Sequence, residues 1–161
     1  MCTVNVPFAI ERKVRPVDPT PALAFDSTLP DETTCAIACD RDIIAARQRG
    51  RSFTLQLGFS SPEATLVATA ISELARNIVL YAERGEIVLK PLDDDGRRGV
   101  LVIARDQGPG LPGDYRQAAG SGAGCHGLFG LSCLVDECEI VSHLGQGTTV
   151  AVKKWQAVPN R

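Results

Sequence analysis

The sequence predicts an α/β fold, a two-layer sandwich in which helices cover one face of a mixed, mostly antiparallel sheet. The first observation is the order of the periodic segments: strand, two helices, two strands, loop, helix and two strands. The second is the run from Val100 to Ala104, which is apolar on both faces and indicates a central strand. The third is the length of 161 residues, with 44% hydrophobic and 22% charged residues, which is enough for one domain with a sizeable core.

A strand and two helices are predicted for the first part of this domain. Residues 34–39 (TCAIAC) are typical of a short strand, and residues 40–59 of a helix that Asp40 caps. The tetrapeptide SSPE, which begins at Ser60, is a helix start with a serine cap, an early proline and a glutamate three residues after the serine. We expect the helix that follows to run to about Ala82.

The second part of the domain is predicted to consist mainly of strands. The run VLVIA indicates a strand interior, and Gly145 and Gly147 are typical of a hairpin turn. We expect strands at residues 85–92 and 99–106, a glycine-rich loop at 107–126, a helix at 127–137 and a hairpin within 138–155.

The N-terminal segment differs in composition from the rest of the chain. Its stretch from Val14 to Thr34 has no sustained period and contains four prolines, at positions 16, 19, 21 and 30. Proline removes backbone donors, so we expect residues 1–33 to be a flexible or extended arm that precedes a domain at residues 34–157. The chain begins without the pattern of a secretory signal and has no apolar run long enough to span a membrane. We therefore predict a cytoplasmic protein that does not act at a membrane.

Charge and cysteine content exclude other classes of function. The formal net charge of −2 provides no basic footprint for nucleic acid. The six cysteines show no Cys-x-x-Cys pair typical of a zinc site, and only two histidines are present. We expect reduced thiols in the core, with Cys125 in the glycine-rich loop as the exposed exception.

The predicted second helix carries two polar residues beside its apolar stripe. Val67, Ile71, Leu74 and Ile78 form that stripe. Glu73 and Asn77 lie about 120° around the helix from it and one turn apart, so they point together. Taken alone, they could equally be a solvated glutamate and a surface amide.

Three further segments contain residues suited to binding a ligand. Asp106 ends the buried strand and is followed by glycines, so its carboxylate can accept a bond from a ligand amine while the backbone approaches closely. A loop with Gly120, Gly122, Gly124 and Gly127 leads into a helix, whose N-terminus can bind phosphates. Thr148 follows the hairpin glycines and could reach a bound base. Turns and a linker would explain these glycines equally well.

In combination, these motifs resemble a known superfamily. ELARN (73–77), DQGPG (106–110), the glycine-rich lid and GQGTT (145–149) are together similar to the GHKL, or Bergerat, ATP-binding fold of histidine kinases, gyrase-type ATPases and anti-sigma factor kinases. More narrowly, DRDIIAARQRGRSFTLQLGF, ATAISELARNIVLYA and GTTVAVKKW resemble the RsbT-type serine kinases. This similarity covers about residues 36–155.

The resemblance implies an activity, cofactors and partners. Such kinases bind ATP with Mg²⁺ and phosphorylate a serine of a STAS-domain antagonist or scaffold protein in a bacterial partner-switching module. They then engage a downstream regulator, often a phosphatase. On this chain the resemblance implies that Asn77 coordinates Mg²⁺, that Glu73 is the catalytic residue that orients or deprotonates the serine hydroxyl, and that Asp106 recognises the adenine amino group.

The resemblance also implies positions that surround the nucleotide. Gly108 and Gly110 match the base of the lid, and Thr148 matches the threonine near the adenine. The positions implied beside the phosphates are Gly122, Gly124, Gly127, Leu128 and Gly130.

The lid of this chain departs from the family pattern. Cys125 stands where a glycine is usual and Phe129 where a proline is usual, while Ala123 and His126 also interrupt the glycine run. A side chain at a position of positive φ costs about 1–2 kcal/mol, which could weaken ATP binding. Two alternatives therefore remain: a catalytically weakened domain that acts as a partner-binding module, and an anti-sigma factor kinase.

Overall fold

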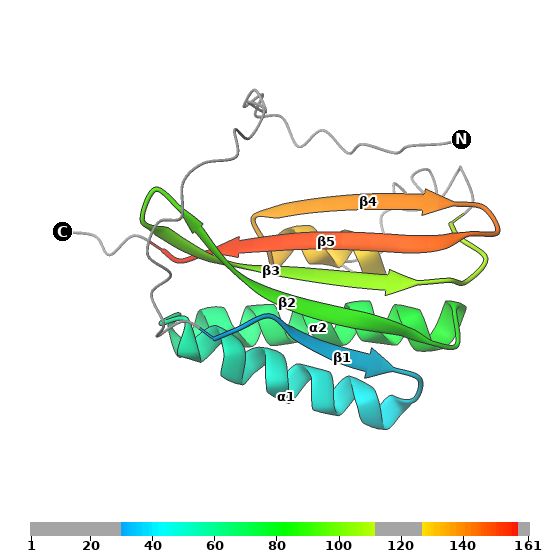
Figure 1. The fold of residues 1–161 in the computed structure, drawn as a ribbon, viewed down its shortest axis with the longest axis horizontal. Coiled ribbons are helices and arrows are strands. Elements are labelled where there is room, and N and C mark those ends of the chain that lie inside the picture. Colours follow the sequence, from blue (N-terminus) through cyan, green and yellow to red (C-terminus); the bar gives the residue numbers. More distant parts are fainter. Residues whose placement is uncertain (1–29, 112–126, 158–161) are drawn as a thin grey trace.

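A computed structural model describes residues 30–111 and 127–157, in which helices cover one face of a five-stranded sheet (Figure 1). The predicted order of elements is confirmed. Along the chain the elements are β1 (Thr33–Ile37), α1 (Asp40–Gln56), α2 (Ser61–Tyr81), β2 (Gly85–Asp94), β3 (Arg97–Asp106), the 3₁₀ helix η1 (Gly127–Cys133), β4 (Glu137–His143) and β5 (Gly147–Trp155).

The sheet has the order β1-β2-β3-β5-β4, and each neighbouring pair among these strands is antiparallel. The sandwich is therefore as predicted, although the part of the sheet that the structure describes contains no parallel pair. Strand β3 lies in the middle, which confirms the expectation for a central strand. Val100 and Val102 of β3 point toward the helices and are almost fully buried.

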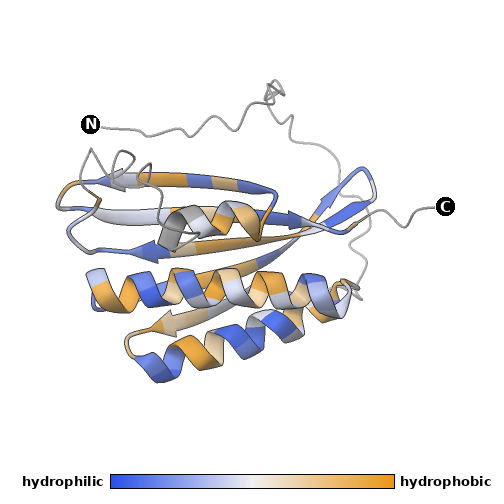
Figure 2. Cartoon of the chain, turned by 180° about the vertical axis from the view of Figure 1, so that it is seen from behind, coloured by the Kyte–Doolittle hydropathy of each residue, from blue (hydrophilic) through white to orange (hydrophobic). Residues whose placement is uncertain are grey.

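The core lies between one face of the sheet and the two long helices. Seen from the helix side, α1 is more hydrophilic than α2 on the surface turned to solvent (Figure 2). The predicted stripe of α2 is buried, with Ile71 at its centre. Gly50 of α1 packs directly against Ile71, and a Cβ added at Gly50 would overlap the end of the Ile71 side chain. This contact brings the two helices close together.

The start of α2 has the predicted capping box. The Ser60 hydroxyl accepts from the Glu63 backbone amide at 3.4 Å, and the Glu63 carboxylate accepts from the Ser60 amide at 2.9 Å. Burial raises the pKa of Glu63, but hydrogen bonds from the Ser60 hydroxyl and from the backbone amides of Ala157 and Ser60 outweigh it and hold that pKa below its ordinary value.

The predicted cap of α1 was wrong. Cys39 occupies the cap position, and Asp40 is the first helical residue. The Asp42 carboxylate, at the third helical position, reaches back and accepts from the amides of Ala38 at 2.9 Å and Cys39 at 3.1 Å, which completes a capping box with Cys39. The helix ends before the expected residue 59 because Gly58 has φ +88, outside the helical region.

The predicted helix at 127–137 is also wrong in length and type. Only η1 forms there, and it ends at Cys133. The Asp136 amide bonds to the Lys153 carbonyl at 2.9 Å, which draws the following residues into the sheet. Tertiary pairing therefore overrides the helical pattern. A seven-residue 3₁₀ helix replaces the α-helix whose N-terminus was expected beside the phosphates.

The expectation of core thiols holds for only part of the described cysteines. Cys35 is buried and Cys138 is partly buried, and its burial raises the pKa of the Cys138 thiol. Cys39 and Cys133 are exposed, because they lie at the start of α1 and the end of η1 rather than on a core-facing strand. Cys125 lies outside the described residues.

Two further findings concern the described residues alone. Within 30–111 and 127–157, none of the helices is long and apolar enough to cross a membrane. The same ranges contain no group of three His, Cys, Asp or Glu side chains that could hold a metal ion by themselves. Most of the predicted N-terminal arm and of the glycine-rich loop lie outside them, so the boundary of the domain stays a prediction.

Candidate functional site

The carboxylate of Asp106 is held at the end of β3 by two backbone amides. Its Oδ1 atom accepts from Gly108 N at 2.9 Å and from Thr148 N at 3.2 Å. The side chain is half-buried. Because both bonds end on Oδ1, Oδ2 can accept a bond from a ligand. The sequence predicted Asp106 as a ligand-binding residue, but not the amides that fix its orientation.

Glycines allow the backbone to approach closely around Asp106. Gly147 has φ +97, and a Cβ there would overlap the Asp106 carbonyl oxygen. A Cβ at Gly108 would lie 2.7 Å from the Ala82 Cβ, and one at Gly110 would overlap the His143 carbonyl. These three glycines therefore join the end of β3 to β4, β5 and the end of α2.

Ser142 is a buried residue of this cluster that the sequence reasoning missed. Its hydroxyl accepts from Leu111 N at 2.8 Å and lies 2.9 Å from the Thr148 hydroxyl. It thus links the segment after Gly110 to the start of β5. A signal was present, because Ser142 follows Ile140 at a spacing of two in β4 and so faces the core, where a polar side chain needs partners.

Glu73 and Asn77 lie on α2 at the border between the core and the solvent. Both are partly buried. A Glu73 carboxylate oxygen lies 3.2 Å from Arg76 Nη1, and the two side chains are 30% and 57% exposed respectively. Among the residues that the structure describes, nothing bonds to the Asn77 amide. The sequence reasoning did not anticipate the partner Arg76.

The two groups of residues lie at the same end of the molecule. The C-terminal ends of α2 and β3 and the start of β5 meet at the right-hand side of Figure 1. Gly108 packs against Ala82, which lies five residues after Asn77. The structure thus brings Asp106 into contact with Gly108 and Thr148, places Gly110 against the end of β4, and joins this group through Gly108 to the helix that carries Glu73 and Asn77.

The remaining predicted positions are only partly described. Gly122 and Gly124 lie outside the described residues, as do the lid departures Ala123, Cys125 and His126. The backbone of Gly127 and Leu128 belongs to η1, and Gly130 in the same element is buried.

An open pocket of about 860 Å³ adjoins Asp106 at the ends of the strands. An ion pair of 3.4 Å between Arg105 and Glu86 crosses two of these strands. None of the residues that line this pocket belongs to α2, so it does not include Glu73 or Asn77. The lining comprises Thr34, Ala36, Ile37, Ala38, Arg84, Gly85, Glu86, Arg105, Asp106, Gln107 and Thr149.

The chemistry of these groups fits a magnesium nucleotide. A fixed carboxylate such as Asp106 can accept from an exocyclic amine, and an amide oxygen such as that of Asn77 suits a hard cation that also binds phosphates. Glu73 is partly exposed, so its carboxylate can meet a hydroxyl that arrives from solvent.

Comparison with known proteins adds one close relative. No protein-family profile matches the chain. The serine/threonine-protein kinase RsbT of Bacillus subtilis (strain 168) is 42% identical to the chain over 130 residues. The matched region covers 78% of this chain and 97% of that relative.

Proposed function

This chain belongs to the family of RsbT-type serine/threonine-protein kinases, and we propose that it transfers a phosphoryl group from Mg-ATP to a serine of a STAS-domain protein. That protein is an antagonist or scaffold in a bacterial partner-switching module, and the kinase afterwards engages a downstream regulator. Because ATP and such modules are cytoplasmic, we propose the same location for this chain.

The observation that carries the proposal is the fixed carboxylate of Asp106. It is oriented by two backbone amides and joined through Gly108 to the helix that carries Glu73 and Asn77. An adenine amine would bond to the free oxygen of Asp106. Asn77, which has no partner among the described residues, would be the protein ligand of Mg²⁺. When bound, Mg-ATP supplies the transferred phosphoryl group.

Glu73 has the role of a general base in this proposal. Its carboxylate accepts the proton of the acceptor serine as the serine Oγ forms its bond to phosphorus and the terminal phosphoanhydride bond breaks. Phosphoryl transfer depends mainly on positioning and charge neutralisation, so one carboxylate near the hydroxyl, together with the metal and backbone donors, is sufficient.

The test combines nucleotide binding with phosphotransfer by the purified full chain. Binding of ATP is measured by calorimetry with and without Mg²⁺, and labelled ATP is used to detect phosphoserine on a panel of STAS-domain proteins. We expect Asn77→Ala to lose the magnesium-dependent part of ATP binding. Glu73→Ala should retain ATP binding but lower kcat by at least about 100-fold.

A matched control removes a carboxylate from an exposed position far from these residues. Glu139→Ala on β4 should leave both ATP binding and phosphotransfer unchanged. Full phosphotransfer by Glu73→Ala would refute its role as the base. Binding of a STAS-domain protein without any phosphotransfer by the wild type would favour a binding module over a working kinase.

A further inference from the structure

β1 lies at one edge of the sheet, and its outer side has no partner strand among the residues that the structure describes. In that part of the chain β1 pairs with β2 alone, and the backbone hydrogen bonds of turns and loops do not involve residues 33–37. In an edge strand, alternate amide and carbonyl groups point away from the neighbouring strand and can pair with another extended segment. The outer side of β1 can therefore accept a sixth strand.

The two edges of the sheet differ in how they are protected against pairing with other chains. β4, at the opposite edge, has the sequence ECEIVSH, with two glutamates and a histidine. β1 has the sequence TTCAI, which contains no charged residue and no proline. Charged residues and prolines are common means by which an edge strand avoids such pairing. Because β1 lacks both, we expect another segment to cover its edge.

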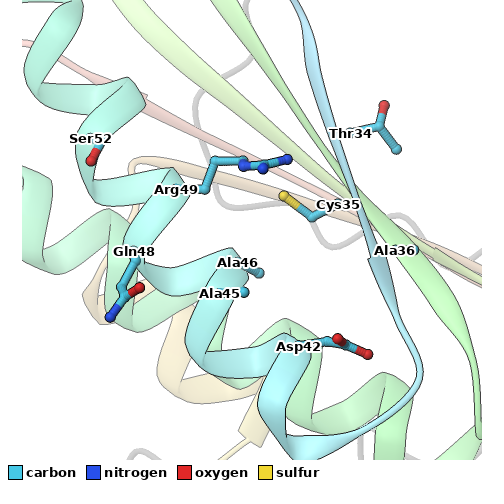
Figure 3. Close-up of a pocket in the computed structure, with 9 residues that line it drawn as sticks. All are labelled: Thr34, Cys35, Ala36, Asp42, Ala45, Ala46, Gln48, Arg49 and Ser52. Atoms are coloured by element: carbon cyan, nitrogen blue, oxygen red, sulfur yellow. The ribbon is translucent and has the colours of Figure 1, made fainter.

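A hollow of about 560 Å³ lies beside this edge, between β1 and α1. The small side chains of Cys35, Ala45 and Ala46 line it, and Arg49 extends from α1 toward β1 (Figure 3). Arg49 is exposed, and within the described chain it forms neither a hydrogen bond nor an ion pair. An extended segment that paired with β1 would direct every second side chain toward this hollow.

Residues 4–10, in the N-terminal arm, have the sequence pattern that such a segment requires. Pro7 has no amide hydrogen, so it fits an edge strand in which its nitrogen faces solvent. The backbone groups of the residues on either side of Pro7 would then point toward β1. Every second residue is apolar, and these four share one face of an extended strand: Val4, Val6, Phe8 and Ile10.

Charge and chain length favour an antiparallel arrangement of this segment on β1. The Asp42 carboxylate bonds to the Ala38 amide just after the end of β1, and Arg49 lies two helical turns, about 10 Å, further toward the start of β1. An antiparallel segment would bring Glu11 to Arg49, whereas a parallel one would bring it to the like charge of Asp42. Residues 11–32 connect the segment to β1 and can span about 70 Å when extended, which is long enough.

We propose that residues 4–10 bind to the outer edge of β1 as a sixth strand of the sheet, antiparallel to β1. Their apolar side chains fill the hollow between β1 and α1, and Glu11 pairs with Arg49. The segment belongs to the same chain and covers an edge that would otherwise be open to pairing with other chains. This inference concerns the assembly of the sheet and does not depend on the proposed phosphotransfer.

The test is amide hydrogen exchange of the full chain, followed by NMR. In the wild type we expect protection of those amides of residues 33–37 that do not bond to β2, because the segment bonds to them. Phe8→Asp places a charge in the hollow and should make these amides exchange at least about tenfold faster. Ala9→Asp is the matched control, because it adds the same charge on the opposite face and should leave their exchange unchanged. The amides of residues 100–104 in β3 should stay protected in both variants, which shows that the domain remains folded.

A charge exchange between the two partners tests the direction of the segment. Glu11→Arg and Arg49→Glu should each make the same amides exchange about threefold faster. The double variant restores an ion pair of reversed sign and should recover the protection of the wild type. No recovery in the double variant would overturn the antiparallel arrangement.

The remaining outcomes decide whether this segment is the occupant of the edge. Rapid exchange of these amides in the wild type, or equal protection in the wild type and Phe8→Asp, would overturn the proposal. Protection that rises with protein concentration, together with dimers in analytical ultracentrifugation, would also overturn it, because a second copy would then cover the edge. None of these measurements requires ATP or a protein substrate, so a chain that transfers no phosphoryl group would refute only the kinase mechanism.

Discussion

The two ends of the sheet are held together by different kinds of contact. At the site end, where β3 ends and β5 begins, side-chain oxygens of Asp106 and Ser142 bond mainly to backbone amides, and glycines allow backbone to touch backbone. At the far end, where β5 stops at Trp155, side chains bond to one another across exposed strands, as in the 2.8 Å pair of Lys153 and Glu137. The site end therefore depends mainly on glycine contacts and buried bonds to the backbone, whereas the far end adds exposed pairs of side chains.

The largest loss of unfolding free energy is expected from a substitution of Gly147. In Gly147→Ala, the new Cβ meets the Asp106 carbonyl at a residue with φ +97, so strain and overlap add to about 3 kcal/mol of lost unfolding free energy. Gly145→Ala is the control, because Gly145 has φ +74 but nothing near its Cβ, and it should lose only about 1 kcal/mol. Urea unfolding measures both. Equal losses would show that close packing at the site end contributes nothing beyond the strain of positive φ.

This contrast explains what the sequence could predict. Backbone geometry is reflected in glycines and in the residue types of caps, so the hairpin glycines Gly145 and Gly147 and the capping box at Ser60 were predicted correctly, whereas the binding role of Asp106 stays a prediction. The order of the elements followed from the apolar periodicity. Contacts that depend on tertiary structure have no such local signal in the sequence. The sequence did not reveal that Cys39 would be the cap of α1, with the Asp42 carboxylate bonded back to the Cys39 amide.

The errors in the candidate site have the same origin. The helix predicted after the lid became η1, because the Asp136 amide pairs with β5. The roles of Glu73 and Asn77 came from a family resemblance and stay predictions, since the helical period alone was equally consistent with surface residues. Ser142 was missed because its structural role depends on Leu111, which is 31 residues away in sequence, and on Thr148 across the β4–β5 hairpin.

A smaller loss of stability is expected from a substitution of Ser142 at the site end. Ser142→Ala leaves the Leu111 amide and the Thr148 hydroxyl without their buried partner, and we expect about 2 kcal/mol of lost stability. The control is Thr65→Ala, which removes an exposed hydroxyl that bonds only to a helix carbonyl and should change stability by less than about 0.5 kcal/mol. Similar values for the two variants would mean that burial gives the site end no added sensitivity.

At the far end, the contribution of Glu63 to the free energy of unfolding should depend on pH. Its folded pKa lies below the ordinary value of 4.5, so its contribution is complete above pH 4.5 and is lost as the pH falls through the folded pKa. Glu63→Gln should therefore be less stable than the wild type by about 1 kcal/mol at pH 7, and the difference should shrink at pH 3. Glu139→Gln, on an exposed carboxylate without a described hydrogen bond, is the control. A difference that stays constant with pH would contradict the role of the ionised carboxylate.

The smallest effect is expected from the pair of Lys153 and Glu137. Hydrogen bonds from Lys153 and then from Trp155 hold the pKa of Glu137 below its ordinary value, yet the Lys153 and Glu137 side chains are 40% and 52% exposed. Water screens such a pair, so Lys153→Met should change the unfolding free energy by less than about 0.5 kcal/mol. The measurement is urea unfolding at low and at high salt, because any effect should disappear in high salt. A loss above about 2 kcal/mol would mean that the exposed pair of Lys153 and Glu137 acts as a cooperative unit with the Trp155 ring. The two ends would then be equally intolerant of substitution, and the contrast between them would not hold.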